Sequence, residues 1–203
     1  AQRSVVSYLI FRPSSNQNLG SGDRIETMRE ISTTISAKVT EWNYICTLIN
    51  PSLLLADSFE PKPIPADSSA EIVFWYDITN LYALFVDCMQ YLHQKGIYFN
   101  RTKIKLNDSD KLLTIMQNNG FLSKADVRMI SNFVEAIKEA RSCFCHNKQQ
   151  SAFNAKKVAN GFGSHPDEWK FYSHLGCQST FDFDKGTELL YSKTKLIIDK
   201  IDN

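Results

Sequence analysis

The chain has 203 residues, which is enough for one domain with a substantial core. Hydrophobic residues make up 43% of the sequence and charged residues 22%, values typical of a globular protein. No apolar run reaches membrane-spanning length, which argues against a transmembrane segment. The net charge of +1 is unevenly placed, because residues 100–160 hold 11 Lys and Arg against 5 Asp and Glu, a local excess of +6. Such a segment can attract a polyanion, although a solvated helical face has the same composition.

The cysteines and the first residues bear on the cellular compartment in which the protein is expected. The five cysteines are odd in number, and three of them fall in predicted helices, which favours reduced thiols over a disulfide framework. The segment Ala1–Arg12 lacks a signal-peptide core. We therefore expect a cytoplasmic protein.

The first 50 residues predict an arm and then a long helix. Residues 1–22 are predicted to form an N-terminal arm, and residues 23–203 a helical domain. Asp23-x-x-Glu26 resembles a capping box. Apolar residues then recur every three or four positions until Pro51, which ends the predicted helix.

A second helix is predicted to follow Ser68-x-x-Glu71, a capping box of the serine type. It runs to about Lys95, and Gly96 is its expected C-terminal cap. Its residues are apolar nearly all round, so we expect this helix at the centre of a bundle.

The middle of the chain predicts an extended segment over residues 97–106 and a short helix over residues 108–117. A longer amphipathic helix is expected to begin at Ser123-x-x-Asp126. The residues of its predicted buried stripe are Val127, Ile130, Phe133, Val134, Ile137 and Phe144.

The last third predicts shorter elements. We expect short helices over residues 150–160 and after Ser164, with a turn at 161–163 between them. A final amphipathic helix is predicted over residues 184–201. The whole pattern predicts an all-α fold, an antiparallel bundle of about five helices.

The clearest chemical motif lies near the end of the amphipathic helix. Arg141 precedes His146 by five positions, and a polar residue, Ser142 or Asn147, follows each. Arg141 continues the apolar stripe four residues after Ile137, where a charge needs a partner or a cleft. On an ideal helix, Arg141 and His146 are about 140° apart. They converge only if the helix ends or bends between them, or if a second protomer completes the site.

Arg141-x4-His146, near the end of a helix in a small helical domain, resembles the HEPN superfamily. The resemblance implies a HEPN-like fold and a metal-independent endoribonuclease that cleaves single-stranded RNA without a cofactor. It also implies a homodimer, and a toxin or antiphage defence effector with an antitoxin or a larger defence complex as partner. The alternative is a noncatalytic HEPN-like module for dimerisation or nucleotide binding.

The chemistry expected of the motif is phosphodiester cleavage. His146 would take the proton of the ribose 2′-hydroxyl or donate one to the leaving oxygen. Arg141 would hold the phosphate and stabilise the added negative charge. The residues expected to bind or orient the substrate are Ser142, Asn147, Lys138 and Lys148.

Structural roles compete with this hypothesis. Arg141 can instead bond to backbone carbonyls or to Glu135 or Glu139, and His146 can act as a cationic C-terminal cap. Zinc binding is a further alternative, although the spacing is unusual for it. The candidate zinc ligands are Cys143, Cys145, His146, His165, His174 and Cys177.

A loose aromatic group in the last third has two interpretations. Its side chains can stack on RNA bases, or they can cover the end of the bundle. We favour the second interpretation. The group consists of Trp169, Phe171, Tyr172, His174 and Phe181.

Overall fold

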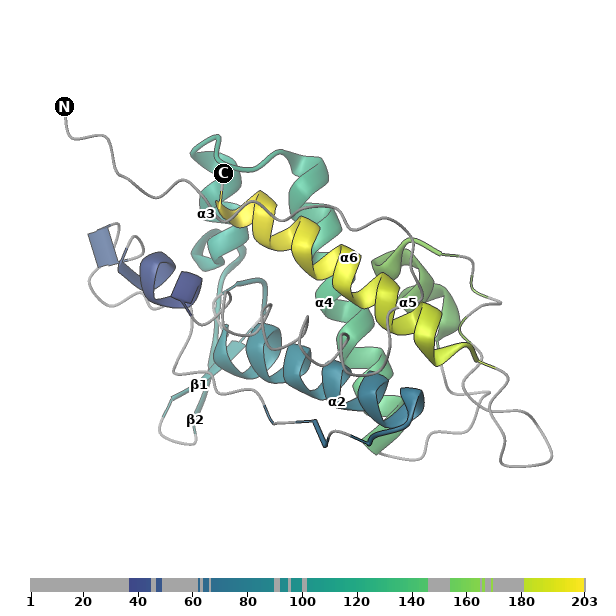
Figure 1. Ribbon diagram of the computed structural model, residues 1–203. Coiled ribbons are helices and arrows are strands. Elements are labelled where there is room, and N and C mark those ends of the chain that lie inside the picture. The colour runs from purple at the N-terminus through teal and green to yellow at the C-terminus, as the bar shows by residue number, and fades with distance from the viewer. Residues whose placement is uncertain are drawn as a thin grey trace.

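The computed structural model is a mostly helical assembly with one small β-hairpin (Figure 1). None of the described helices is both long and apolar enough to cross a lipid bilayer. The residues that the structure describes are 37–44, 47–48, 62, 64–65, 67–89, 92–94, 96–99, 102–145, 154–164, 166, 169 and 181–202.

The first predicted helix is confirmed where the structure describes it, over residues 37–44 and 47–48. Val39 and Trp42 are buried in the main core, in agreement with the apolar spacing. Lys38 donates hydrogen bonds of 2.6 and 2.8 Å to the carboxylate of Asp202, near the end of the chain. The predicted arm, residues 1–22, and the start of the predicted helix lie outside the described residues.

The second helix begins almost where the sequence predicts but ends earlier. Helix α2 spans Ala70–Tyr82, and its N-cap is Ser69, whose side chain accepts a hydrogen bond from the Ile72 backbone N–H. A π-helical segment, η1, continues it over Ala83–Cys88. The prediction that the helix runs to Lys95 is wrong, since the chain leaves the helical path at Met89.

A β-hairpin and a short helix follow in the chain. The predicted extended segment is an antiparallel hairpin of β1, Gly96–Phe99, and β2, Thr102–Lys105. Gly96 therefore begins a strand and is not the predicted helix cap. A short 3₁₀ turn, η2 (Asp108–Asp110), precedes helix α3 (Leu112–Asn118), so the predicted short helix is confirmed with a break.

Helix α4, Lys124–Cys145, begins at the predicted capping box. Ser123 Oγ accepts a hydrogen bond of 3.1 Å from the Asp126 backbone N–H, and Asp126 Oδ2 accepts one of 3.1 Å from the Ser123 N–H. These reciprocal bonds satisfy two N–H groups at the start of the helix. Most of the predicted stripe is buried, but Phe144 is 42% exposed.

Helix α5, Ala155–Phe162, is packed closely against α4. Gly163 ends it with a φ of +75°, as the predicted turn requires. Gly161, however, belongs to the helix itself. A Cβ atom there would lie 2.3 Å from the Cβ of Ala136 in α4, so only glycine fits without a shift of the two helices. The predicted turn at 161–163 is therefore wrong at Gly161. The missing side chain of this glycine lets α5 approach α4 closely.

The last helix, α6, spans Phe183–Asp202 and confirms the predicted element. It runs parallel to α2, since Phe74 contacts Phe183 while Asp77, further along α2, bonds to Tyr191, further along α6. The same direction is visible from the colours of the two helices in Figure 1. The predicted bundle is thus antiparallel only in part.

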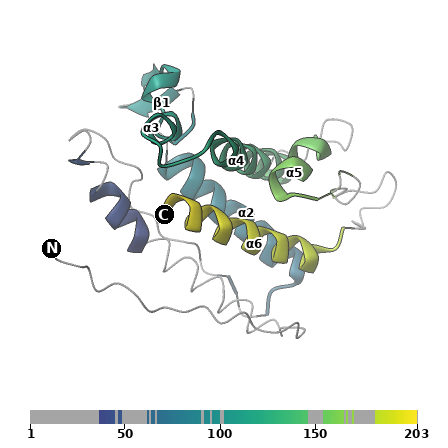
Figure 2. The ribbon, with the colours of Figure 1, turned by 90° about the horizontal axis from the view of Figure 1, so that it is seen from above.

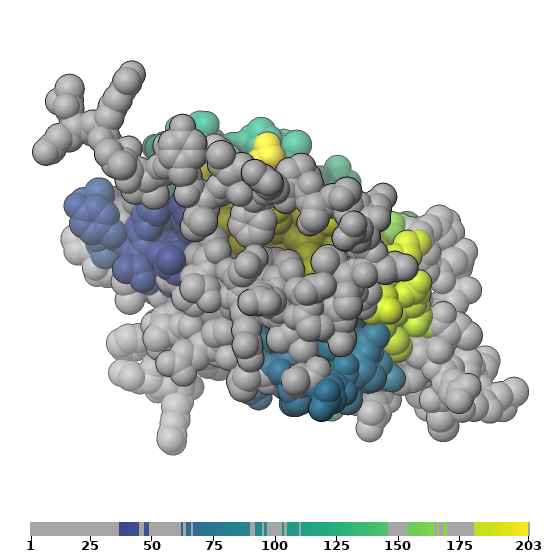
Figure 3. All heavy atoms as spheres, viewed as in Figure 1, coloured from purple at the N-terminus to yellow at the C-terminus, as the bar shows by residue number. Residues whose placement is uncertain are grey.

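Figure 2 shows α2 and α6 side by side, with α4 on the other side of α2 and α5 beyond α4. Helix α4 runs antiparallel to α2, because Trp75 stacks on Phe144 while Phe85 contacts Phe133. The face of the molecule in Figure 3 exposes parts of α2, of α6 and of the helix at residues 37–44.

One end of the core is an aromatic cluster. Trp169 is fully buried, and its ring centroid lies 4.7 Å from Phe162 and 5.1 Å from Phe181. Phe74 of α2 lies 6.5 Å from the same indole. Trp169 and Phe181 therefore cover the end of the bundle and are not a platform for bases. The other members of the predicted aromatic group lie outside the described residues.

Candidate active site

The candidate site is built on the last two turns of α4. Lys138, Arg141 and Ser142 lie on this helix, whose last described residue is Cys145. The other three predicted site residues, His146, Asn147 and Lys148, lie outside the described residues. Helix α4 and the antiparallel helix α2 thus position the site.

Arg141 is stacked on an aromatic ring. Its Cζ lies 4.6 Å from the centroid of the Tyr82 ring, at the end of α2. The guanidinium Nε is buried and has no hydrogen-bond partner among the described residues. The stripe position of Arg141 predicts such partial burial, and the face of a tyrosine ring stabilises a cation that has left water.

The structural alternative for Arg141 is an ion pair with Glu135 or Glu139. Among the described residues, neither carboxylate pairs with Arg141. Glu135 instead bonds to Lys138 and Lys157, each at 2.8 Å. Glu139 accepts a bond of 3.4 Å from the Asn154 backbone N–H at the start of α5.

The charge of Arg141 also acts on a carboxyl group, that of Asp87. Partial burial raises the pKa of Asp87, and the positive charge of Arg141 opposes this rise. The pKa of Tyr82 is raised, first by burial and then by the charge of Asp87, while Arg141 again opposes the rise. The three side chains therefore share one electrostatic environment. Tyr82 and Asp87 are both more than 50 residues from Arg141 in the chain, so sequence spacing does not connect them with it.

Lys138 and Ser142 flank the arginine on α4. The Lys138 side chain is 36% exposed, and its Nζ donates a bond of 2.8 Å to Glu135 Oε1. Ser142 is half-buried. Since the Lys138 charge is already opposed by Glu135, it contributes to an anion site mainly through long-range attraction.

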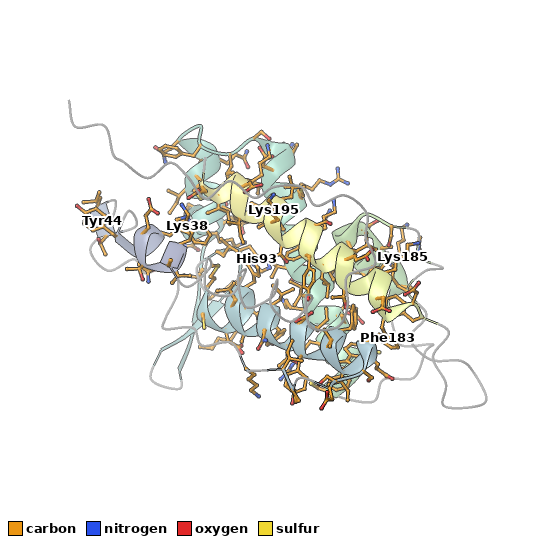
Figure 4. All side chains as sticks on the ribbon, viewed as in Figure 1. Lys38, Tyr44, His93, Phe183, Lys185 and Lys195 are labelled. Atoms are coloured by element: carbon orange, nitrogen blue, oxygen red, sulfur yellow. The ribbon has the colours of Figure 1, made fainter. Side chains whose placement is uncertain are left out.

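A second polar cluster surrounds Glu135. His93 Nε2 lies 3.5 Å from Glu135 Oε1, and the side chain of His93 is only 9% exposed. Figure 4 marks His93 near the middle of the view, between Tyr44 and Lys185. The pKa of Glu135 is lowered, first by His93 and then by Lys138 and Lys157. This cluster links the loop after η1 to α4 and α5, and sequence spacing gives no sign of it.

The thiol groups of α4 have different surroundings. Cys143 is buried in the main core, whereas Cys145 is exposed. Within the described part of the chain, no group of three His, Cys, Asp or Glu residues is arranged to hold a metal ion. The remaining candidate zinc ligands, His146, His165, His174 and Cys177, lie outside the described residues.

Comparisons with known proteins do not assign the chain to a family. No family model, no curated protein and no solved structure matches the chain.

Proposed function

We propose that the protein is a metal-independent endoribonuclease that cleaves single-stranded RNA, with Arg141 and His146 as its catalytic residues. The proposal includes a HEPN-like domain, which acts as a homodimer in the cytoplasm as a toxin or an antiphage defence effector. The observation that carries it is the state of Arg141. Its guanidinium is fixed on the Tyr82 ring, and no described residue neutralises it through a direct ion pair.

The mechanism follows from the proton and charge changes of the reaction. The ribose 2′-oxygen attacks the adjacent phosphorus, and the bond from phosphorus to the 5′-oxygen breaks. The products are a 2′,3′-cyclic phosphate and a 5′-hydroxyl. His146 accepts the 2′-hydroxyl proton or donates one to the 5′-oxygen, and a second protomer supplies the other transfer. Arg141 binds the phosphate through N–H groups and stabilises its increased negative charge.

The charge of the segment that contains the site supports binding of RNA. The segment of residues 100–160 has an excess of +6, and it includes the whole of α4. Attraction of this kind accelerates encounter with a polyanion and weakens as salt is added.

The test is cleavage of a labelled single-stranded RNA in excess chelator. Arg141→Ala and His146→Ala should each lower the rate at least a hundredfold. Arg141→Lys should also be strongly impaired, because lysine keeps the charge but loses the planar fork and the ring stack. Arg128→Ala is the matched control, since Arg128 is an exposed arginine of the same helix.

The outcomes separate the candidate functions. Cleavage that leaves a cyclic phosphate end and requires both residues supports the nuclease. Equal cleavage by all variants would place the activity elsewhere. No cleavage by the parent protein as a homodimer would contradict the nuclease and favour the noncatalytic dimerisation or nucleotide-binding module.

A further inference from the structure

The ring of Phe144 is exposed, although its position belongs to the apolar stripe of α4. Phe144 lies in the last turn of this helix and is 42% exposed. Its ring is stacked on the buried indole of Trp75 in α2, with the two centroids 4.7 Å apart and the planes 11° from parallel. The indole covers one face of the Phe144 ring and fixes its plane, so the exposed surface of the ring lies on the opposite side.

Phe144 is a neighbour of the candidate catalytic arginine. Residues three positions apart on a helix lie side by side, with Cβ atoms about 5–6 Å apart, and Phe144 follows Arg141 at this spacing. Both side chains also face α2, where Phe144 meets Trp75. The guanidinium Cζ of Arg141 lies 4.6 Å from the centroid of the Tyr82 ring. An exposed aromatic ring thus stands next to a partly buried cation.

A nucleotide fits this pair of side chains. Every nucleobase has a flat π face that stacks on an aromatic ring, and the phosphate attached to its ribose is an anion. Phe144 offers the ring, and Arg141 offers a guanidinium whose Nε has no hydrogen-bond partner among the described residues. Both belong to the segment of residues 100–160, which has an excess charge of +6. The separation of the two side chains is comparable with that between the base and the phosphate of one nucleotide.

We propose that Phe144, supported by Trp75, is a stacking subsite for one unpaired nucleobase of RNA, beside the phosphate that Arg141 binds. This inference rests on the proposed function, because it names the part of the RNA that lies next to the scissile phosphate. Bases within a duplex are covered on both faces by their neighbours, whereas an unpaired base can turn its face to the ring. The subsite therefore selects single strands over duplexes, and it does not select one base over another.

The test is the fluorescence of 2-aminopurine, a base analogue whose emission falls when it stacks on an aromatic ring. The probe is a short single-stranded RNA with 2-aminopurine at each position in turn and a 2′-O-methyl group on every ribose, so that no 2′-hydroxyl is available for cleavage. The full chain should quench the analogue at one position. Phe144→Leu should abolish this quenching and weaken binding at least about fivefold, because it removes a base stack. Phe144→Trp should retain both the quenching and the affinity.

A control variant and a second probe separate stacking from a general disturbance of the protein. Phe121→Leu is the matched control, since Phe121 is a 65% exposed phenylalanine just before the start of α4, at the end remote from Phe144. It should leave quenching and affinity unchanged. The second probe lacks the base at the quenched position. The parent should bind it at least about fivefold more weakly than the complete RNA, whereas Phe144→Leu should bind the two probes equally.

The results are separable from those of the cleavage assay. Quenching that requires Phe144, without RNA cleavage, would support the subsite and contradict the nuclease. Cleavage together with unchanged quenching in Phe144→Leu would support the nuclease and overturn the subsite. Absence of quenching at every position in the parent would also overturn it. A change from dimer to monomer in Phe144→Leu, with quenching unchanged, would overturn the subsite and place the ring at an interface between protomers.

Discussion

A buried carboxyl group lies at the contact between α2 and α6. Asp77 is fully buried, and its Oδ2 accepts a hydrogen bond of 3.2 Å from the Tyr191 hydroxyl. Its other oxygen, Oδ1, has no hydrogen-bond partner among the described residues. Burial raises the pKa of Asp77 to about 8, and the bond from Tyr191 opposes this rise only partly. The folded protein therefore favours the protonated side chain near neutral pH.

The raised pKa predicts a loss of stability as pH rises. The folded state holds the Asp77 proton up to about pH 8, while the unfolded chain releases it near the ordinary value of 3.8. The contribution of this group is full below pH 3.8 and is lost as pH rises towards 8. Over this window the free energy of unfolding should fall by about 1 kcal/mol per pH unit.

The measurement is urea unfolding of the parent and of Asp77→Asn at pH 5.5 and 7.5. Asp77→Asn should remove most of this pH dependence, because the amide does not ionise. Asp67→Asn, which changes an exposed aspartate, should retain the slope of the parent. Identical slopes in the parent and Asp77→Asn would contradict the raised pKa.

At the scale of the elements, the contact between α4 and α5 depends on one missing side chain. Gly161 has no Cβ, and a Cβ there would lie 2.3 Å from the Ala136 Cβ and 2.5 Å from the Asn132 carbonyl oxygen. Both atoms belong to α4, and one of them is backbone, so neither moves easily. The closeness of the helices also allows Lys157 of α5 to reach Glu135 of α4 at 2.8 Å.

Two opposing effects decide the result of Gly161→Ala. Alanine favours a helix over glycine by about 1 kcal/mol. Overpacking at a contact with no free space costs about 1–3 kcal/mol, and here it should exceed the helix gain. Gly161→Ala should therefore lower the free energy of unfolding measured in urea. Asn160→Ala, at the exposed neighbouring position, should leave stability unchanged or raise it slightly.

At the same scale, the cap at Ser123 shows what local sequence specifies. Its hydroxyl and the Asp126 carboxylate satisfy each other's backbone N–H groups within four residues. A cap of this kind is complete without any other helix, which is why the start of α4 is where the pattern predicts. The end of α2 has no such local device, and packing of Leu84, Phe85 and Val86 in the core accompanies the change to a π-helix.

At the scale of the whole molecule, Trp169 joins elements that are distant in sequence. Its fully buried indole contacts Phe74 of α2, Phe162 of α5 and Phe181, which lies two residues before the start of α6. The indole Nε1 also donates a hydrogen bond to Ser164 Oγ. Removal of this one side chain should therefore loosen several elements together.

Trp169→Ala should lower the free energy of unfolding by about 3–5 kcal/mol, the usual cost of removing a fully buried large aromatic side chain. The check is chemical unfolding followed by far-ultraviolet circular dichroism, which does not depend on tryptophan emission. Tyr44→Ala should change stability by less than about 0.5 kcal/mol, since its side chain is mostly exposed. A similar small change in Trp169→Ala would show that the aromatic cluster is not a central part of the core.

The candidate site divides in the same way between local pattern and long-range contact. Arg141 was identifiable because a charge continues the apolar stripe of a periodic helix. Tyr82 was not, because its contact with Arg141 requires α2 to pack against α4. His93 and Glu135 likewise meet across 42 positions of sequence. His146 was identified from spacing alone, and its position remains a prediction.

The linear pattern of residues specifies the mostly helical class, the start of α4, the approximate limits of α6, and the places where apolar faces are buried. Helical periodicity and capping groups act within a few residues, so a linear pattern specifies them. The parallel course of α2 and α6, the close approach at Gly161 and the stack of Arg141 on Tyr82 arise only when the helices pack together. These features depend on which helix faces lie against each other, and that choice minimises the free energy of the whole core at once.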